Sequence, residues 1–169
     1  MAIMDMRRFI ETLDHITPPM SVALVILLGF SLVNPGAADE KATREECVAK
    51  CKEAARLIKE IGLEAALDKI NDPNGPFRWK DTYIFAFDSE TCKVLAHQSP
   101  KIVGYMAKDL KDVNGKLYFQ EFLQVANTKG EGWVSYVYPK VPGGMAEPKT
   151  TYILKVPGEK VIVGAGIYE

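Results

Sequence analysis

The sequence has few of the residues that catalysis and metal binding most often use. It contains two histidines, His15 and His97, and three cysteines, Cys47, Cys51 and Cys92. An H-E-x-x-H zinc helix, a G-x-S-x-G nucleophile turn and a C-x-x-C-H haem attachment are absent. We therefore expect a protein without enzymatic activity, with no metal site and no cofactor.

An excess of positive charge is also missing. The chain carries 21 Lys and Arg residues against 22 Asp and Glu residues, which gives a formal net charge of -1. No basic run is interleaved with aromatic residues, so the release of counterions that drives nucleic-acid binding has no source. DNA and RNA are excluded as expected partners.

Neither the length nor the composition indicates several domains or a disordered chain. The 169 residues correspond to about one domain. Hydrophobic residues make up 47% and charged residues 25% of the sequence, with 10 prolines and 13 glycines. This composition is that of an ordinary globular protein and excludes collagen-like and coiled-coil-only chains.

Residues 1–38 differ from the rest of the chain. A pair of arginines precedes an apolar run over residues 20–33, which is shorter than the roughly 20 residues that span a bilayer. Small residues follow the run, so the segment is predicted to be a secretory signal peptide cleaved after Ala38. The alternative is an uncleaved membrane anchor. Either interpretation places residues 39–169 outside the cytoplasm.

A long amphipathic helix is predicted to follow the signal segment. Thr43 and Glu46 form a capping box, and the polar turn at residues 71–76 ends the helix, with Gly62 as a point where it could kink. Its apolar positions are Cys47, Cys51, Ala54, Ile58, Ile61 and Ala65. Such a stripe favours packing on the helix's own domain, while a homodimer seam along the helix is the alternative.

The remainder of the chain is predicted to be rich in strands. Segments with alternating apolar and polar residues cover 83–88, 92–97, 133–138, 150–156 and 160–167. Residues 117–126 instead have apolar residues at helical spacing. We expect an α+β fold with a long helix, five strands and a helical insertion between strands 2 and 3.

The ordered motifs of residues 39–169 resemble a known family. "YIFAFDSETCKVLAHQSPKIVG", "DVNGKLYFQEFLQVANTKGEGWVSYVYPK" and "PKTTYILKVPGEKVIVGAGIY" follow the predicted helix in this order. The combination is similar to the single Cache domain, the extracytoplasmic sensor module of bacterial chemoreceptors and sensor kinases. The resemblance implies a PAS-like five-stranded antiparallel sheet with the long helix packed on it, and a pocket for a small molecule. We expect the domain to signal through a separate membrane receptor or sensor-kinase partner.

Candidate ligand-binding residues are strand-borne aromatics, one histidine and two cations. They are Tyr83, His97, Tyr136, Tyr138, Lys149, Arg78, Trp79 and Tyr152. The resemblance favours Lys149 over Arg78, because Lys149 matches a lysine with which a strand begins in the family. It also makes a ligand contact by His97 as plausible as a structural role. Rings and hydroxyls beside a cation suit a small organic acid or amino acid. The alternative for each residue is a structural role, as a core aromatic or a solvated lysine.

The odd number of cysteines allows at most one internal disulfide. Cys47 and Cys51 lie on successive turns of the predicted helix, and a bridge from either of them to Cys92 is as plausible as a bridge between the two. We prefer three buried thiols, because both helix cysteines are on the apolar stripe. The second function that the sequence leaves open is a periplasmic redox or cofactor-binding accessory protein that uses these cysteines.

Overall fold

The computed structural model describes residues 40–141 and 143–169. The predicted signal peptide, residues 1–38, lies outside the described residues. Within the described ranges, no helix is both long enough and apolar enough to cross a membrane. All of the elements below belong to the predicted sensor domain.

Two consecutive helices open the domain where one was expected. Helix α1, Arg44–Ile61, begins with the predicted capping box, in which Thr43 and Glu46 bond each other's backbone N–H groups. It ends at Gly62, whose φ of 83° and ψ of 160° lie outside the helical region, and helix α2, Leu63–Asn71, follows at once. The break changes the helix direction, so Ile61 and Ala65 from the predicted stripe are exposed.

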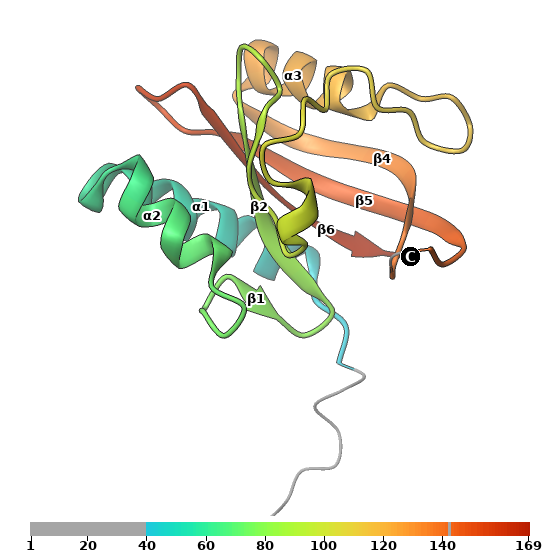
Figure 1. Cartoon of the computed structure of the whole chain (residues 1–169), viewed down its shortest axis with the longest axis horizontal. Helices are drawn as coiled ribbons and strands as arrows, with labels where there is room; N and C mark the ends of the chain where they lie inside the picture. The colour runs from blue at the N-terminus through green and yellow to red at the C-terminus, as the bar shows by residue number, and fades with distance from the viewer. Residues whose placement is uncertain (1–39, 142) are drawn as a thin grey trace, which may run out of the picture. The chain divides into compact units, whose positions relative to one another are not determined.

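The sheet is antiparallel throughout, and within the described residues it has six strands (Figure 1). The strands are β1 (Arg78–Trp79), β2 (Thr82–Asp88), β3 (Val94–Ala96), β4 (Glu131–Pro139), β5 (Ala146–Lys155) and β6 (Val161–Tyr168). Their order is β1-β2-β6-β5-β4, and β3 pairs with β2. A short 3-10 helix η1, Pro100–Ile102, and helix α3, Tyr118–Lys129, lie in the chain between β3 and β4.

The α+β class and the helix-on-sheet architecture are confirmed, with two corrections. The two-residue strand β1 was not predicted, because so short a segment has no period to detect. Residues 139–149 lie outside the predicted strands, but β4 extends to Pro139, β5 begins at Ala146, and Pro148 pairs with Val137 inside the ladder. The proline is tolerated because its backbone polar atoms face away from β4, where its carbonyl accepts from Glu169 N–H, and on that side β5 pairs with β6 only from Lys149 onward.

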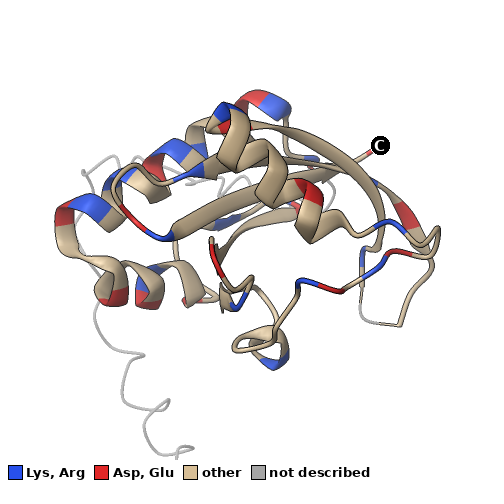
Figure 2. Ribbon diagram, turned by 90° about the horizontal axis from the view of Figure 1, so that it is seen from above, with Lys and Arg blue, Asp and Glu red and all other residues tan. Residues whose placement is uncertain are grey.

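Hydrophobic clusters cover both faces of the sheet. On one face, α1 and α2 pack against small and aliphatic residues such as Ile84, Val163 and Ala165. On the other face, α3 packs against aromatic residues such as Phe85 and Phe87. Charged residues gather on the helices and loops, whereas the central strands are mostly uncharged (Figure 2). The alternation along β2 and β6 thus assigns consecutive residues to two different cores.

Candidate ligand-binding site

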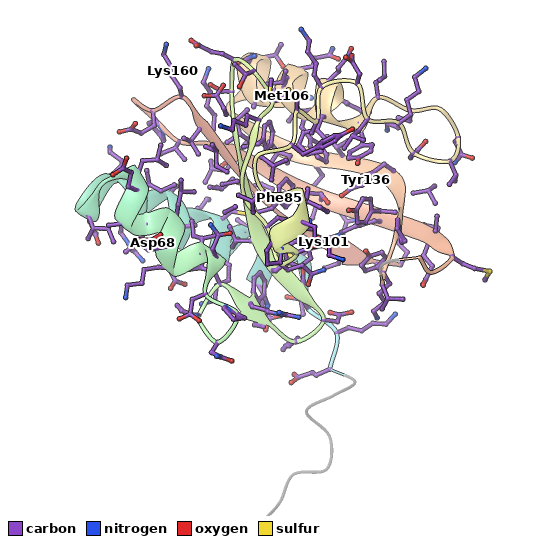
Figure 3. All side chains as sticks on the ribbon, viewed as in Figure 1. Asp68, Phe85, Lys101, Met106, Tyr136 and Lys160 are labelled. Carbon is purple, nitrogen blue, oxygen red and sulfur yellow. The ribbon has the colours of Figure 1, made fainter. Side chains whose placement is uncertain are left out.

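A cavity of about 370 Å³ lies between the aromatic face of the sheet, helix α3 and the segment that follows β3. Most of its lining is apolar or aromatic. Figure 3 shows Phe85 and Tyr136 on the sheet and Lys101 on the η1 turn that crosses the sheet in this view. A concave site of this size and character is what proteins use to hold small molecules.

Four of the predicted site residues line this cavity: Tyr83, His97, Tyr136 and Tyr138. Tyr136 and Tyr138 share one face of β4, since side chains alternate along a strand, and Tyr83 belongs to the same aromatic cluster from β2. His97 follows β3, where the Asn71 side chain accepts a hydrogen bond from its backbone N–H at 3.1 Å. Strands β2 and β4 therefore bring three tyrosine hydroxyls to the cavity, and His97 joins them from the end of β3.

Lys149 is buried directly behind this wall. It stands opposite Tyr136 in the β4–β5 ladder and is 3% exposed. Its Nζ lies 5.1, 5.2 and 4.7 Å from the ring centroids of Tyr83, Tyr138 and Tyr168, and 3.4 Å from the Tyr168 hydroxyl, to which it donates. Lys149 is not among the residues that line the cavity, but it contacts rings that do, and it also lines a second cavity of about 280 Å³.

The charge of Lys149 has no acidic partner in the part of the chain that the structure describes. No carboxylate oxygen in residues 40–141 and 143–169 lies within 4.0 Å of its Nζ. Burial lowers the pKa of Lys149 to about 8, so the ammonium is still mostly protonated at neutral pH. Its direct contacts are tyrosine rings and one long hydrogen bond, and Asp81 attracts it from farther away. A buried cation in such surroundings is a favourable partner for an anion.

Gly166 on β6 provides the space for the Lys149 side chain. A Cβ at this position would lie 2.7 Å from Lys149 Cε, 3.2 Å from the Thr150 carbonyl oxygen and even closer to Thr151 Oγ1. Thr151 cannot easily turn away, because its hydroxyl is bonded to the Tyr136 hydroxyl at 3.1 Å. Gly166, the second glycine of the closing "GAGIY" motif, thus allows a lysine to be buried here.

The hydrogen bonds of His97 leave the Tyr83 hydroxyl free to donate. Burial, and then the nearby Lys149, lower the pKa of His97 to about 4, so its ring is neutral. The backbone N–H of Ser99 donates to Nδ1 at 3.0 Å, which leaves the proton on Nε2. Nε2–H therefore donates to the Tyr83 hydroxyl oxygen at 3.0 Å, and the hydroxyl proton of Tyr83 remains for another acceptor.

Asp112 holds the loop that forms another wall of the cavity. One of its carboxylate oxygens accepts from the backbone N–H groups of Asn114 and Lys116, both at 2.9 Å. The other accepts from the backbone N–H of Val137 on the edge strand β4 at 3.0 Å. These bonds lower the pKa of Asp112 and tie the loop to the sheet.

The structure places the other three predicted site residues away from the cavity. Tyr152 pairs with Trp133, so both are on the opposite face of the sheet, and the Tyr152 hydroxyl donates to Glu131. Arg78 is exposed on β1, and Trp79 packs against the helix-side core. For Tyr152 the reason is the strand period, because an odd separation from Lys149 puts the two on different faces.

Sequence reasoning missed the contribution of α3 and of the end of the chain. Tyr118, Phe119 and Phe122 line the cavity from α3, and Tyr168 contacts Lys149 from β6. Phe119 and Phe122 were recognised only as the apolar face of a helix. The one sequence signal for Tyr168 is its place at the end of the family-like motif. Its position opposite Lys149 comes from the ladder in the structure.

The three cysteines are free and buried, as preferred from the sequence. Cys47 and Cys51 belong to the helix-side core, whereas Cys92 belongs to the aromatic core on the other side of the sheet. Burial raises the pKa of Cys47 to about 12 and that of Cys51 well above its ordinary value. Thiols of this kind hold little reactive thiolate at neutral pH.

Metal chemistry finds no support in the described residues. Nowhere in residues 40–141 and 143–169 do three or more His, Cys, Asp or Glu side chains gather in a way that would hold an ion. His97, the one histidine in that part of the chain, has both ring nitrogens engaged by Ser99 and Tyr83.

Fold and cavity together define a small-molecule-binding domain made of an antiparallel sheet between two helical layers. A family model for the Cache domain matches residues 52–169. The chain belongs to the Cache domain family, as its motifs predicted. One curated relative is the methyl-accepting chemotaxis protein CtpM of Pseudomonas aeruginosa, 33% identical over 90 residues, which are 52% of this chain and 16% of that protein. The chain thus matches a small part of this relative.

Solved structures of similar fold come from chemosensory and chemotaxis proteins. A Cache chemosensory domain described for its recognition of carboxylic acids has a TM-score of 0.61 and 23% identity, covering 73% of this chain and 91% of that one. A methyl-accepting chemotaxis protein from Vibrio parahaemolyticus has a TM-score of 0.60 and 26% identity, covering 73% and 86%. A periplasmic sensor domain of a chemotaxis protein has a TM-score of 0.59 and 23% identity, covering 73% and 88%.

Proposed function

We propose that residues 39–169 form an extracytoplasmic sensor domain that binds a small carboxylate and passes its occupancy to a membrane receptor or sensor-kinase partner. The observation that carries the proposal is the buried ammonium of Lys149, which has no carboxylate partner in the described chain. The relatives support a sensing role, because the proteins that this chain resembles are chemotaxis sensors.

An anionic ligand explains why a lysine would be kept in this position. Burying an ammonium without a counterion destabilises a fold, so the empty domain bears a free-energy cost that an anion can offset. The Tyr83 hydroxyl, free to donate, lines the cavity, and the Lys149 ammonium lies behind the Tyr83 ring, 5.1 Å from its centroid. A carboxylate that accepts a hydrogen bond from Tyr83 would also be attracted by the Lys149 charge, which is screened little inside the fold.

The route to the partner depends on the segment before the domain. We propose that residues 1–38 direct export and are removed after Ala38, which leaves a periplasmic protein. Mass spectrometry of the periplasmic fraction should then find Asp39 as the first residue. Recovery of the full-length chain from the membrane fraction would instead favour the anchored alternative. Because the site offers no nucleophile with a base, we expect the ligand to be released chemically unchanged.

Calorimetric titration with a panel of carboxylates tests the site. For any compound that binds, Lys149→Met should weaken the affinity by about 10- to 100-fold, the amount that corresponds to losing the attraction of one buried charge. Lys155→Met is the matched control, because Lys155 lies on the same strand but its Nζ donates to Asn127. Equal affinity in the parent and in Lys149→Met would contradict the proposal, whatever the ligand.

A further inference from the structure

We propose that the ligand is an organic acid with a bulky, preferentially aromatic, apolar body and without an ammonium group next to its carboxylate. This inference rests on the proposed function, because it takes Lys149 and its tyrosines as the carboxylate end. It narrows the class of ligand from organic acids and amino acids to apolar acids, and it follows from two features of the cavity.

The first feature is the size and lining of the cavity. A volume of about 370 Å³ is within the range of pockets that enclose drug-sized ligands and far exceeds what a two- or three-carbon acid fills. Away from Lys149, rings from Phe85 on β2 and from Phe119 and Phe122 on α3 form the wall. An apolar body placed there would replace water against carbon surface, which small acids cannot do.

The rings are already arranged as aromatic partners. Phe119 and Phe122 lie edge to face at 5.3 Å, and Phe122 lies edge to face with Tyr136 at 5.4 Å. Tyr118 and Tyr136 are stacked at 4.5 Å with an angle of 8° between their planes. A flat ring inserted beside them would add one more pair of the same geometry, which is favourable beyond the area that it buries.

The second feature is that the cavity has no acidic group to spare for an ammonium. Among its lining residues in the described chain, Asp112 alone is acidic, and Lys101 and Lys111 are basic. Both carboxylate oxygens of Asp112 already accept hydrogen bonds, from the three backbone N–H groups that hold the loop. An α-ammonium group would lose its water here without gaining a carboxylate, and it would lie near like charges.

Three matched compounds test the inference by calorimetric titration of the full domain, residues 39–169, whose elements all lie within the described fold. They are 3-phenylpropionate, propionate, which lacks the ring, and L-phenylalanine, which adds the ammonium. We expect 3-phenylpropionate to bind about 10- to 100-fold more tightly than propionate, as for burial of a phenylalanine side chain. We expect L-phenylalanine to bind at least tenfold more weakly than 3-phenylpropionate.

A variant separates the apolar body from the carboxylate end. Ile102 is partly buried and lines the cavity from η1, so Ile102→Ala should weaken 3-phenylpropionate several-fold and leave propionate unchanged. Propionate or L-phenylalanine binding as tightly as 3-phenylpropionate would overturn the inference, as would no detectable binding of 3-phenylpropionate at millimolar concentration. The proposed function would survive each of these results if Lys149→Met weakens the affinity for whichever compound does bind. It would fail if Lys149→Met weakens the affinity for none of them.

Discussion

The two faces of the sheet are built from the same strands and differ in their packing, their charge and their space for a ligand. The helix face is covered by α1 and α2 and packed mainly with small or aliphatic residues, including Cys47, Cys51 and Ala54, all fully buried, although Phe77 and Tyr152 belong to this core too. The other face is covered by α3 and a long loop, is rich in aromatic rings, and contains the cavity and a buried ammonium. One face is suited to close packing and the other to holding a ligand.

Side-chain size explains the difference. Alanine and cysteine on α1 let the helix approach the sheet closely, so that Ile58 and Val163 fill the remaining space. On the other face, Gly164 and Gly166 in β6 remove side chains where Phe85 and Lys149 need room. The stability of the domain should therefore depend mainly on the helix face, and its affinity for a ligand should depend on the cavity face.

The largest expected effect is a loss of stability from the helix face. Ile58 is 1% exposed, so Ile58→Ala should lower the free energy of unfolding by about 2–5 kcal/mol, through lost burial and the void left behind. Chemical denaturation measures this value. Ile61→Ala, one turn along at an exposed position, should change it by less than about 0.5 kcal/mol. Similar losses for the two variants would mean that α1 does not carry the core.

Gly166→Ala should damage the cavity face in both stability and binding. The added methyl group overlaps Thr151 Oγ1 and Lys149 Cε, so the free energy of unfolding should fall by about 1–3 kcal/mol and the lysine should be displaced. Affinity for any carboxylate should fall with it. Gly132→Ala is the control, since its methyl group would meet only a Val125 methyl group at 2.9 Å. Unchanged binding in Gly166→Ala would break the link between this glycine and the site.

The buried ammonium makes the cavity face less stable than it could be. Lys149→Met removes a charge that has no acidic partner, so the ligand-free domain should gain roughly 1–3 kcal/mol in the free energy of unfolding at pH 7. The same substitution is thus expected to stabilise the ligand-free domain and to weaken the binding of a carboxylate. A loss of stability would show that the ammonium is satisfied within the empty fold.

The same gain should depend on pH in a defined direction. The pKa of Lys149 is about 8 in the fold and has an ordinary value of 10.5, so between these values the unfolded chain binds more protons than the native one. Stability of the parent therefore rises from pH 8 towards pH 10 as the penalty disappears, relative to Lys149→Met. The advantage of the variant should shrink over that range, which denaturation at several pH values would measure as a difference between the two proteins.

The sequence predicts the helix face of the sheet better than the cavity face. The helix face could be predicted because its signals are local: the Thr43 capping box and the spacing of Cys47, Cys51, Ala54 and Ile58. Strand period also placed Tyr136 and Tyr138 together. The same period separates Tyr152 from Lys149, but which of the two faces meets the cavity depends on how distant strands pair. Likewise the partnership of Lys149 with Tyr168 and Gly166 arises from β5–β6 register, which no local pattern contains.

The smallest expected effect concerns charges at the entrance of the cavity. Lys101 and Lys111 are exposed lining residues, and their positive potential should attract an anion before it reaches Lys149. Replacing both by alanine should slow association of a carboxylate several-fold at low ionic strength and leave the free energy of unfolding within about 0.5 kcal/mol of the parent. Stopped-flow measurements of 3-phenylpropionate binding would detect the change through its rate.

A control variant and measurements at several salt concentrations test whether the slower association is specific to lysines on the cavity face. Lys52 and Lys59 are exposed on α1, so their double alanine variant changes the net charge equally but on the helix face. It should leave association nearly unchanged, because the cavity opens on the other side of the sheet and charges beyond about 10 Å are screened at 0.1 M salt. The difference between the two double variants should disappear as salt is raised. Equal slowing by both would indicate attraction by the net charge of the whole domain, and the entrance lysines would then have no special role.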